Sequence, residues 1–258
     1  MSALSGVAVA SDGSALETGI TADSLAPLLR DDAAGLQARG GIATRAVPLN
    51  ADEDLATRLC ALPAAVIFLT HTDPARSRAA ARAVREAGGP IVVTEADTTM
   101  IALTAALLTT IGRAGHTPAS ARVVLAGSAA MPDLCPLLIA VGVGDITSWN
   151  AADAAVFPLH GLARHADAVI DLLGAEHGRA PAVLSPEPGY RLLAAPGLLA
   201  ALARYPAAVL DFDVLRACAL SLAAATGRDQ LVPDLDDPDL AGEISSGVLR
   251  ALAHRTTS

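Results

Sequence analysis

The 258-residue chain contains no lysine, because all 18 of its basic residues are arginine. A lysine Schiff base, a phosphate-loop lysine and a lysine general acid or base are therefore excluded for this chain. Aromatic residues are also scarce, at 2% of the sequence, whereas hydrophobic residues make up 52%. We therefore predict a core of closely packed alanine, leucine, valine and isoleucine.

Long hydrophobic runs and excess positive charge are also missing. Apolar runs such as MIALTAALLTTIG (100–112) fall short of the roughly 20 residues that span a bilayer, which favours a buried helix. No basic segment precedes an apolar one near residue 1, so we expect no secretory signal and a cytoplasmic protein. The net charge of −9, without a basic run, argues against nucleic-acid and anionic-membrane partners.

The three cysteines, Cys60, Cys135 and Cys218, lie far apart in apolar surroundings and lack metal-binding spacing. We predict that they are buried free thiols, with no redox or metal role.

Short apolar runs alternate with Ala- and Leu-rich stretches of helical character along the whole chain. Strands that are apolar throughout are typical of parallel sheets covered on both faces, and the alternation indicates right-handed βαβ units. We therefore predict an α/β protein with two open parallel-sheet lobes. The predicted strands are 6–10, 44–49, 64–70, 90–94, 121–127, 145–149, 166–172, 180–185 and 207–212.

Several helices carry recognisable end signals. A capping side chain or an Asp-Pro pair marks a helix start, and a glycine pair marks a helix end. The predicted helices are 25–39 capped by Ser24, 75–88 opened by Asp73-Pro74 and ended by Gly88-Gly89, 98–114 capped by Asp97, and a last helix at 239–254.

Polar residues cluster directly after three predicted strands, in THTD (70–73), TEADTT (94–99) and SPEPGY (185–190). Ligands of doubly wound sheets bind beyond the carboxyl ends of the strands, so a site is expected there. Other polar groups have simpler explanations. His160 and His165 have the wrong spacing for a ligand pair on one helical face, and the acidic run at 234–239 lacks the pattern of a calcium loop.

The order of the segments resembles the malic enzyme family over almost the whole chain. The resemblance implies a malate-binding lobe, residues 1–97 with the C-terminal region 214–258, and a Rossmann-like NAD-binding-type domain, 98–213. It also implies a homodimer. The segments that carry it are VAVASDGSAL (7–16), PLLRDDAAGLQAR (27–39), AAVIFLTHTD (64–73), GPIVVTEADTTMIALTAALLTTIGRAG (89–115), VVLAGSAAMPDLCPLLIAVGV (123–143), PGLLAALARYP (196–206) and VPDLDDPDLAGEISSGVLRALA (232–253).

The family's functional residues have no counterparts at the matching positions. The resemblance places the catalytic lysine near Asp32, two adjacent metal ligands, a glutamate and an aspartate, at Thr70 and His71, and the third, an aspartate, at Glu95. The family's substrate asparagines correspond to Ala200, Ala201 and Ser185, and its catalytic tyrosine, which precedes the first strand, is expected to have no counterpart. We therefore expect no metal, and His71 with Glu95 remains the alternative as a pair for a borderline metal such as zinc.

The nucleotide-binding turn of the family is also altered. Ala126, Ser128 and Met131 replace the three glycines that permit the turn, the approach of pyrophosphate and close helix packing. Asn150 stands where an acidic residue binds the ribose hydroxyls. This degenerate loop predicts that neither NAD nor NADP is a cofactor.

Three functions are compatible with these residues. The first is a non-catalytic pseudoenzyme that binds a small molecule or a protein partner. The second is a repurposed lyase, isomerase or cyclase without a cofactor, in which His71, Asp73, Glu95 and Asp97 act as acid and base groups. The third is an NAD(P)-dependent malic oxidoreductase with an unusual loop, and the missing site chemistry argues against it.

Overall fold

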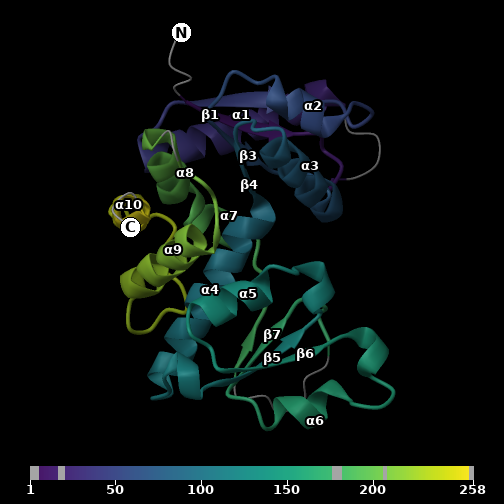
Figure 1. Cartoon of the computed structure of the whole chain (residues 1–258), viewed down its shortest axis with the longest axis vertical. Coiled ribbons are helices and arrows are strands. Elements are labelled where there is room, and N and C mark those ends of the chain that lie inside the picture. The colour runs from purple at the N-terminus through teal and green to yellow at the C-terminus, as the bar shows by residue number, and fades with distance from the viewer. Residues whose placement is uncertain (1–5, 17–20, 176–181, 206–207, 256–258) are drawn as a thin grey trace. The chain divides into compact units, whose positions relative to one another are not determined.

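The computed structural model of the chain describes residues 6–16, 21–175, 182–205 and 208–255 (Figure 1). The chain forms two compact units. Unit 1 comprises Met1–Thr98, Ala195–Leu210 and Pro238–Ser258. Unit 2 comprises Thr99–Ala194 and Asp211–Asp237.

Unit 1 is built on a four-stranded parallel sheet of order β2-β1-β3-β4. Its central strands are apolar and fully buried, as expected for strands covered on both faces. Val7 pairs with Thr44 on one side and with Val66 on the other. The strands are β1 (Val7–Ser11), β2 (Thr44–Pro48), β3 (Val66–Leu69) and β4 (Ile91–Thr94).

Helices cover this sheet and continue its core. The helix after β1 packs on β1 and β2, and α2 packs on α3. Aliphatic and alanine side chains from the strands and from α2 and α3 form one buried cluster around Ile67 and Leu69. The helices are α1 (Ala22–Gly40), α2 (Leu55–Cys60), α3 (Pro74–Glu86), α8 (Ala195–Arg204) and α10 (Leu240–Arg255).

Unit 2 has the same strand arrangement in a second parallel sheet, of order β6-β5-β7-β8. The strands are β5 (Arg122–Ala126), β6 (Asp145–Trp149), β7 (Ala168–Asp171) and β8 (Val183–Leu184). The long helix α4 (Glu95–Arg113) starts in unit 1 and runs mainly through unit 2. Further elements are η1 (Pro118–Ser120), α5 (Leu134–Ala140), α6 (Leu159–Ala163), α7 (Tyr190–Leu193) and α9 (Phe212–Ala225).

The predicted fold class, α/β with two open parallel sheets, is confirmed. The core is aliphatic as predicted, with Phe68 as an aromatic exception that is fully buried. The predicted strand at 207–212 is wrong. Residues 208–211 form no strand, because the Asp211 carboxylate accepts hydrogen bonds from Asp213 and Val214 and so starts α9. Residues 180–181 and 207 of the predicted strands lie outside the described residues.

Two predicted helix caps are also wrong. Thr21, not Ser24, caps α1, and Ser24 is the partner three residues later in a capping box. Asp97 lies inside the first turn of α4, where its carboxylate accepts a hydrogen bond from the backbone N–H of Thr94. By contrast, Asp73 caps α3 as predicted, because its Oδ1 accepts from the backbone N–H groups of Ala75 and Arg76.

The later part of the chain is divided differently from the predicted domains. Helix α8, expected in the Rossmann-like domain, belongs to unit 1 together with α10. Gly197 explains this packing, since a Cβ at this position would lie 2.6 Å from the carbonyl oxygen of Ala241 on α10. Helix α9, expected with the first lobe, belongs to unit 2 and packs on α5.

The thiols differ in exposure: Cys60 is exposed, Cys135 is half-buried and Cys218 is buried. The prediction of buried thiols is therefore correct only for Cys218, where burial raises the pKa well above its ordinary value. In the part of the chain that the structure describes, every helix is too short or too polar to cross a membrane.

Candidate functional site

The polar clusters that follow β1, β3 and β4 meet at the carboxyl edge of the unit 1 sheet. β1 and β3 are neighbours, although β2 lies between them in the sequence, so the strand order reverses between them. Ligands of open α/β sheets bind at such a reversal. Asp12 follows β1, Thr70 and His71 follow β3, and Glu95 follows β4.

The imidazole of His71 is held by Asp32 from α1. Nε2 of His71 lies 2.8 Å from Oδ2 of Asp32, and the two side chains are only 14% and 9% exposed. An ionised carboxylate only accepts hydrogen bonds, so the contact requires a proton on Nε2. The resemblance places a lysine near Asp32 and a metal ligand at His71, and in this structure these two side chains bind each other.

The carboxylate of Glu95 is occupied by the loop after β3. Its Oε1 accepts a hydrogen bond from the hydroxyl of Thr70 at 2.5 Å. Its Oε2 accepts a hydrogen bond from the backbone N–H of His71 at 3.1 Å. Both carboxylate oxygens of Glu95 therefore accept hydrogen bonds from protein groups.

The backbone of His71 adopts a left-handed conformation with φ of 49°, the only positive φ outside glycine among the described residues. Histidine tolerates this region better than most residues, but it remains strained. Two backbone hydrogen bonds of His71 maintain this conformation. Its N–H donates to Glu95, and its carbonyl accepts from the backbone N–H of Ala15 at 3.2 Å.

The other two predicted catalytic carboxylates have capping contacts. Asp73 is exposed, and its Oδ1 is bonded to the start of α3. Asp97 is half-buried, and its Oδ2 accepts from the backbone N–H and the hydroxyl of Thr94 at 2.7 and 2.8 Å. Both carboxylates therefore stabilise helix starts, whereas His71 and Glu95 lie in one hydrogen-bonded network.

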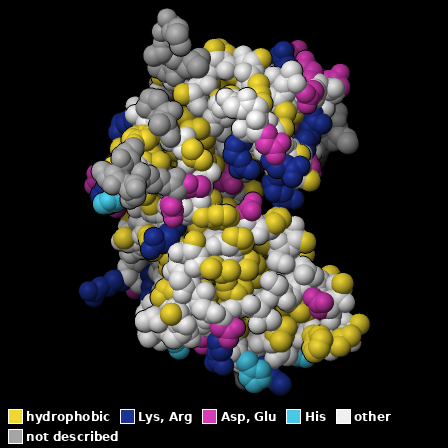
Figure 2. Space-filling view, viewed as in Figure 1, with side chains coloured by type: hydrophobic (Ala, Val, Ile, Leu, Met, Phe, Trp, Pro, Cys, Tyr) yellow, Lys and Arg dark blue, Asp and Glu magenta, His cyan; other side chains and the backbone are white. Residues whose placement is uncertain are grey.

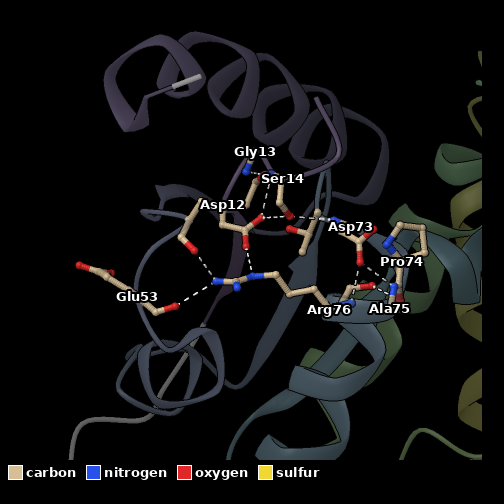
Figure 3. A network of polar contacts seen from close by, with 12 residues as sticks. Asp12, Gly13, Ser14, Glu53, Asp73, Pro74, Ala75 and Arg76 are labelled. Carbon is tan, nitrogen blue, oxygen red and sulfur yellow. Dashed lines mark hydrogen bonds and ion pairs between the residues drawn. The ribbon is translucent and has the colours of Figure 1, made fainter. Parts of the chain in front are cut away.

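A second network fixes the loops beside this site (Figure 3). Arg76 donates from Nε to Oδ2 of Asp12 at 2.5 Å, and from Nη2 to the carbonyls of Ala51 and Glu53. The hydroxyl of Ser14 donates to Oδ1 of Asp12 at 2.7 Å and accepts from the backbone N–H of Asp73 at 2.9 Å. One guanidinium therefore ties together the loops after β1 and β2 and the start of α3.

The Asp12 carboxylate is buried in this network, with a fully covered side chain. Burial raises the pKa of Asp12, but hydrogen bonds from Ser14 and Arg76 and the Arg76 charge outweigh it, so the pKa is lowered. Asp12 is therefore ionised and structural at neutral pH.

The residues at the family's metal positions do not fit a hard divalent cation. Such ions require several oxygen ligands, preferably carboxylates. The three positions that the resemblance assigns to metal ligands offer one carboxylate that already accepts two hydrogen bonds, one hydroxyl that donates to it, and an imidazole paired with Asp32. Within the described ranges, His, Cys, Asp and Glu side chains form no group of three suited to a metal.

The turn after β5 in unit 2 does not fit a dinucleotide. Gly127, in the left-handed region with φ of 85°, leads into a short turn, η2 (Ser128–Ala130), instead of a helix. Helix α5 starts only at Leu134, has seven residues and contains Pro136. A dinucleotide needs backbone N–H groups of a helix start close to the strand, and this turn does not provide them.

Leu173 occupies the space above this turn. A Cβ on Gly127 would lie 2.6 Å from Cγ of Leu173, so the leucine packs directly on the glycine backbone. Asn150 follows β6 at the expected position, but its backbone N–H is bonded to Asp153 at 2.8 Å. Its side-chain oxygen lies 3.5 Å from the hydroxyl of Ser128. Met131 closes η2 through a backbone bond to Ser128.

The remaining candidates differ in their burial. Ala200 and Ala201 are buried in α8 and carry no polar group. His160, His165, Ser185 and Glu187 are exposed, as are most residues of the acidic run 234–239. Tyr190 is buried, and this burial, followed by the charge of Glu187, raises its pKa.

Charge is distributed unevenly over unit 1. Figure 2 shows arginine side chains gathered over α3, where Arg82 and Arg85 are exposed. The sequence has no continuous basic run, but helical spacing places Arg78, Arg82 and Arg85 on one side of α3. The carboxyl edge of the sheet is instead rich in carboxylates.

Sequence reasoning identified His71 and Glu95 but missed Arg76, Asp12 and Ser14. Asp32 was recognised only as the position of a lost lysine. A usable signal for Asp12 was the motif SDGS directly after a strand, at the edge where such sheets bind ligands. Nothing in the local pattern of α3 distinguishes Arg76 from its other arginines.

No family model and no curated protein sequence matches the chain, but solved structures do. The crystal structure of the NAD-dependent malic enzyme from Thermotoga maritima is similar with a TM-score of 0.79 and 16% identity, covering 96% of this chain and 85% of that chain. The malic enzyme from Pyrococcus horikoshii has a TM-score of 0.81 and 16% identity, over 99% and 78%. The malic enzyme from Entamoeba histolytica has a TM-score of 0.79 and 14% identity, over 98% and 70%.

These structures confirm the resemblance at the level of the fold. The likeness covers nearly all of this chain and most of each crystal structure, although few residues are identical. The chain therefore has the fold of the malic enzymes.

Proposed function

We propose that this protein is a non-catalytic relative of the malic enzymes, which binds a small polar molecule at the carboxyl edge of unit 1 and uses no NAD(P). One observation carries the proposal. The residues at the positions of the family's lysine and metal ligands, Asp32, Thr70, His71 and Glu95, are hydrogen-bonded to one another.

Oxidative decarboxylation of malate needs a cation that holds the hydroxy acid, an acid and base pair, and a nicotinamide that accepts hydride. Asp32 and Glu95 place carboxylates where the family has a lysine and a metal ligand. A dicarboxylate would face these charges without a cation to offset them, and like charges at close range repel strongly. The ligand that suits this edge is therefore neutral or positively charged.

Calorimetry on the full chain tests the proposal. The titrants are NAD⁺, NADP⁺ and L-malate with Mn²⁺, and reduction of nicotinamide is followed in parallel by absorbance. The malic enzyme of Thermotoga maritima is the positive control. We expect no saturable binding and no turnover, whereas micromolar binding of a nicotinamide nucleotide together with malate turnover contradicts the proposal.

A screen for thermal stabilisation then separates the classes of ligand. A ligand that binds the native state raises the unfolding temperature, by mass action. We expect neutral or cationic small molecules to raise it, and dicarboxylates to leave it unchanged. A protein partner as the sole ligand contradicts the small-molecule assignment, and a dicarboxylate that stabilises the chain contradicts the expected charge of the ligand. We also propose that the protein is a homodimer, as the resemblance implies. Light scattering measures the molecular mass in solution and so tests this proposal.

A second candidate function is a repurposed enzyme that works without a cofactor. The observation in its favour is the His71–Asp32 pair, because a carboxylate that orients an imidazole is a common arrangement of proton-transfer sites. Asp73 caps α3, and Asp97 is bonded to Thr94 in the first turn of α4, so His71 and Glu95 remain as the proposed acid and base groups. His71→Asn and Glu95→Gln are expected to abolish an isomerase or lyase activity found by substrate screening while leaving the unfolding transition cooperative.

A further inference from the structure

We propose that His71 is a positioned base, and that Asp32 is the residue that positions it. The substrate class is a neutral or cationic small molecule with an acidic O–H, N–H or activated C–H group, whose proton passes to Nδ1 of His71. This inference rests on the second candidate function, since it specifies which atoms of that site act, and if it holds it replaces the non-catalytic assignment.

The two ring nitrogens of His71 have different surroundings. Nε2 is bonded to Oδ2 of Asp32 at 2.8 Å, whereas no described residue is bonded to Nδ1. Because the carboxylate can only accept, it fixes the proton on Nε2 and leaves the lone pair on Nδ1. The side chain is 14% exposed, so the ring is largely enclosed by protein.

The backbone of His71 is equally fixed. Its N–H donates to Glu95 and its carbonyl accepts from Ala15, and these bonds maintain the left-handed φ of 49°. Backbone strain of this kind is often retained where it aims a functional side chain. One hydrogen bond therefore holds the ring and two hold its backbone, which is the preorganisation that a base requires.

The proposed proton transfer balances without a cofactor. Nδ1 takes a proton from the substrate X–H group, whose bonding electrons remain on X. The imidazole becomes an imidazolium, and the Asp32 carboxylate, bonded to Nε2–H, stabilises its charge. Return of the proton from Nδ1 to another atom of the substrate completes an isomerisation.

The tautomer of His71 is the first test. Long-range ¹H–¹⁵N correlation spectra of the full chain report which ring nitrogen carries the proton, and His71→Asn assigns the signals while retaining a residue that tolerates positive φ. We expect the Nε2–H tautomer at neutral pH, and a mixture in Asp32→Asn, whose amide can donate to Nε2. The Nδ1–H tautomer in the native chain overturns the proposal.

Chemical reactivity is the second test and needs no knowledge of the substrate. Diethyl pyrocarbonate reacts with an unprotonated imidazole nitrogen, which displaces ethyl carbonate and forms an N-carbethoxy bond. We expect Nδ1 of His71 to react, and Asp32→Asn to slow this reaction about tenfold, the lower end of what loss of an orienting carboxylate costs. The exposed His160 is the internal control, and its rate is expected to be unchanged.

The tautomer of His71 and the reactivity of its Nδ1 together test whether it is a positioned base. An Nε2–H tautomer with a reactive Nδ1 that depends on Asp32 supports a positioned base. An Nε2–H tautomer with an unreactive ring means that the nitrogen is sealed, and this overturns the proposal. Neither result depends on finding an activity by substrate screening, so failure here is distinct from failure of the second candidate function.

Discussion

Asp32 and His71 are 39 residues apart in the sequence, yet Oδ2 of the aspartate lies 2.8 Å from Nε2 of the histidine. The malic-enzyme resemblance assigns a lysine and a metal ligand to these two positions. In this chain a carboxylate stands on α1 and an imidazole follows β3. The pair therefore replaces one electrostatic arrangement with another.

The first prediction is that these two residues are energetically coupled. His71→Asp places two carboxylates side by side in a largely buried site, and we expect it to lower the free energy of unfolding by about 2 kcal/mol. Adding Asp32→Lys restores an opposite-charge pair and recovers about 1 kcal/mol of that loss. Urea denaturation of the two single variants and the double variant measures the coupling, and strictly additive effects contradict it.

The second prediction concerns pH. The lowered pKa of Asp12 means that its stabilising contribution is present above the pKa of the unfolded chain and is lost as the pH falls through the folded pKa. At pH 7 we expect Asp12→Asn to cost about 1–2 kcal/mol, because an ionised acceptor for Arg76 and Ser14 is lost. The difference from the native chain should begin to shrink below about pH 4, the pKa of an aspartate in the unfolded chain, and should vanish as the pH falls through the lowered pKa of Asp12.

Asp31→Asn is the matched control for this measurement, because Asp31 is an exposed aspartate on α1. Its effect on stability should be within about 0.5 kcal/mol at every pH, as for most surface substitutions. If the Asp12→Asn difference is independent of pH, the ionised carboxylate is not what stabilises the network.

The third prediction concerns the turn after β5. Gly127→Ala introduces a Cβ at a φ of 85° and 2.6 Å from Cγ of Leu173, so we expect a loss of about 2 kcal/mol. Gly161→Ala is the control, because a Cβ at this position on α6 meets no heavy atom within 4 Å apart from its chain neighbours and the backbone of its own helix, and alanine stabilises helices. Adding Leu173→Ala to Gly127→Ala should relieve the clash but not the backbone strain. Equal stability of the Gly127→Ala and native chains contradicts this account of the turn.

The fourth prediction is that restoring glycines does not restore a nucleotide site. The triple variant Ala126→Gly, Ser128→Gly and Met131→Gly still has α5 starting at Leu134 with Pro136 in its first turn. The backbone N–H groups that bind pyrophosphate therefore remain displaced from the strand. Calorimetry with NAD⁺ should detect no saturable binding. Micromolar affinity in this variant would mean that the missing glycines alone prevent the native chain from binding the nucleotide.

The architecture was predictable from the sequence because its signals are local. Apolar runs such as 64–70 identify buried parallel strands, and Asp73-Pro74 identifies the start of α3. The run at 207–212 is equally apolar, but Asp211 competes by capping α9, and the cap prevails. For α4, either Thr94 or Asp97 suits a cap, and only the backbone geometry decides between them.

The site was predictable only in part, because its contacts join distant segments. Polar residues at the carboxyl ends of β3 and β4 pointed to His71 and Glu95 through a general rule for such sheets. The contacts of Asp32 with His71 and of Arg76 with Asp12 depend on how α1 and α3 pack on the sheet. No local sequence pattern encodes that packing, so these partners emerge only from the folded chain.

Electron paramagnetic resonance of Mn²⁺ tests the central claim, that mutual hydrogen bonding has replaced cation binding in unit 1. Titration of Mn²⁺ into the full chain should leave the spectrum of the free ion undiminished. The variant with Asp32→Lys, Thr70→Glu, His71→Asp and Glu95→Asp, which carries the residues implied by the resemblance, should reduce it. Stoichiometric loss of the free-ion signal with the native chain, abolished by Glu95→Gln, contradicts the account.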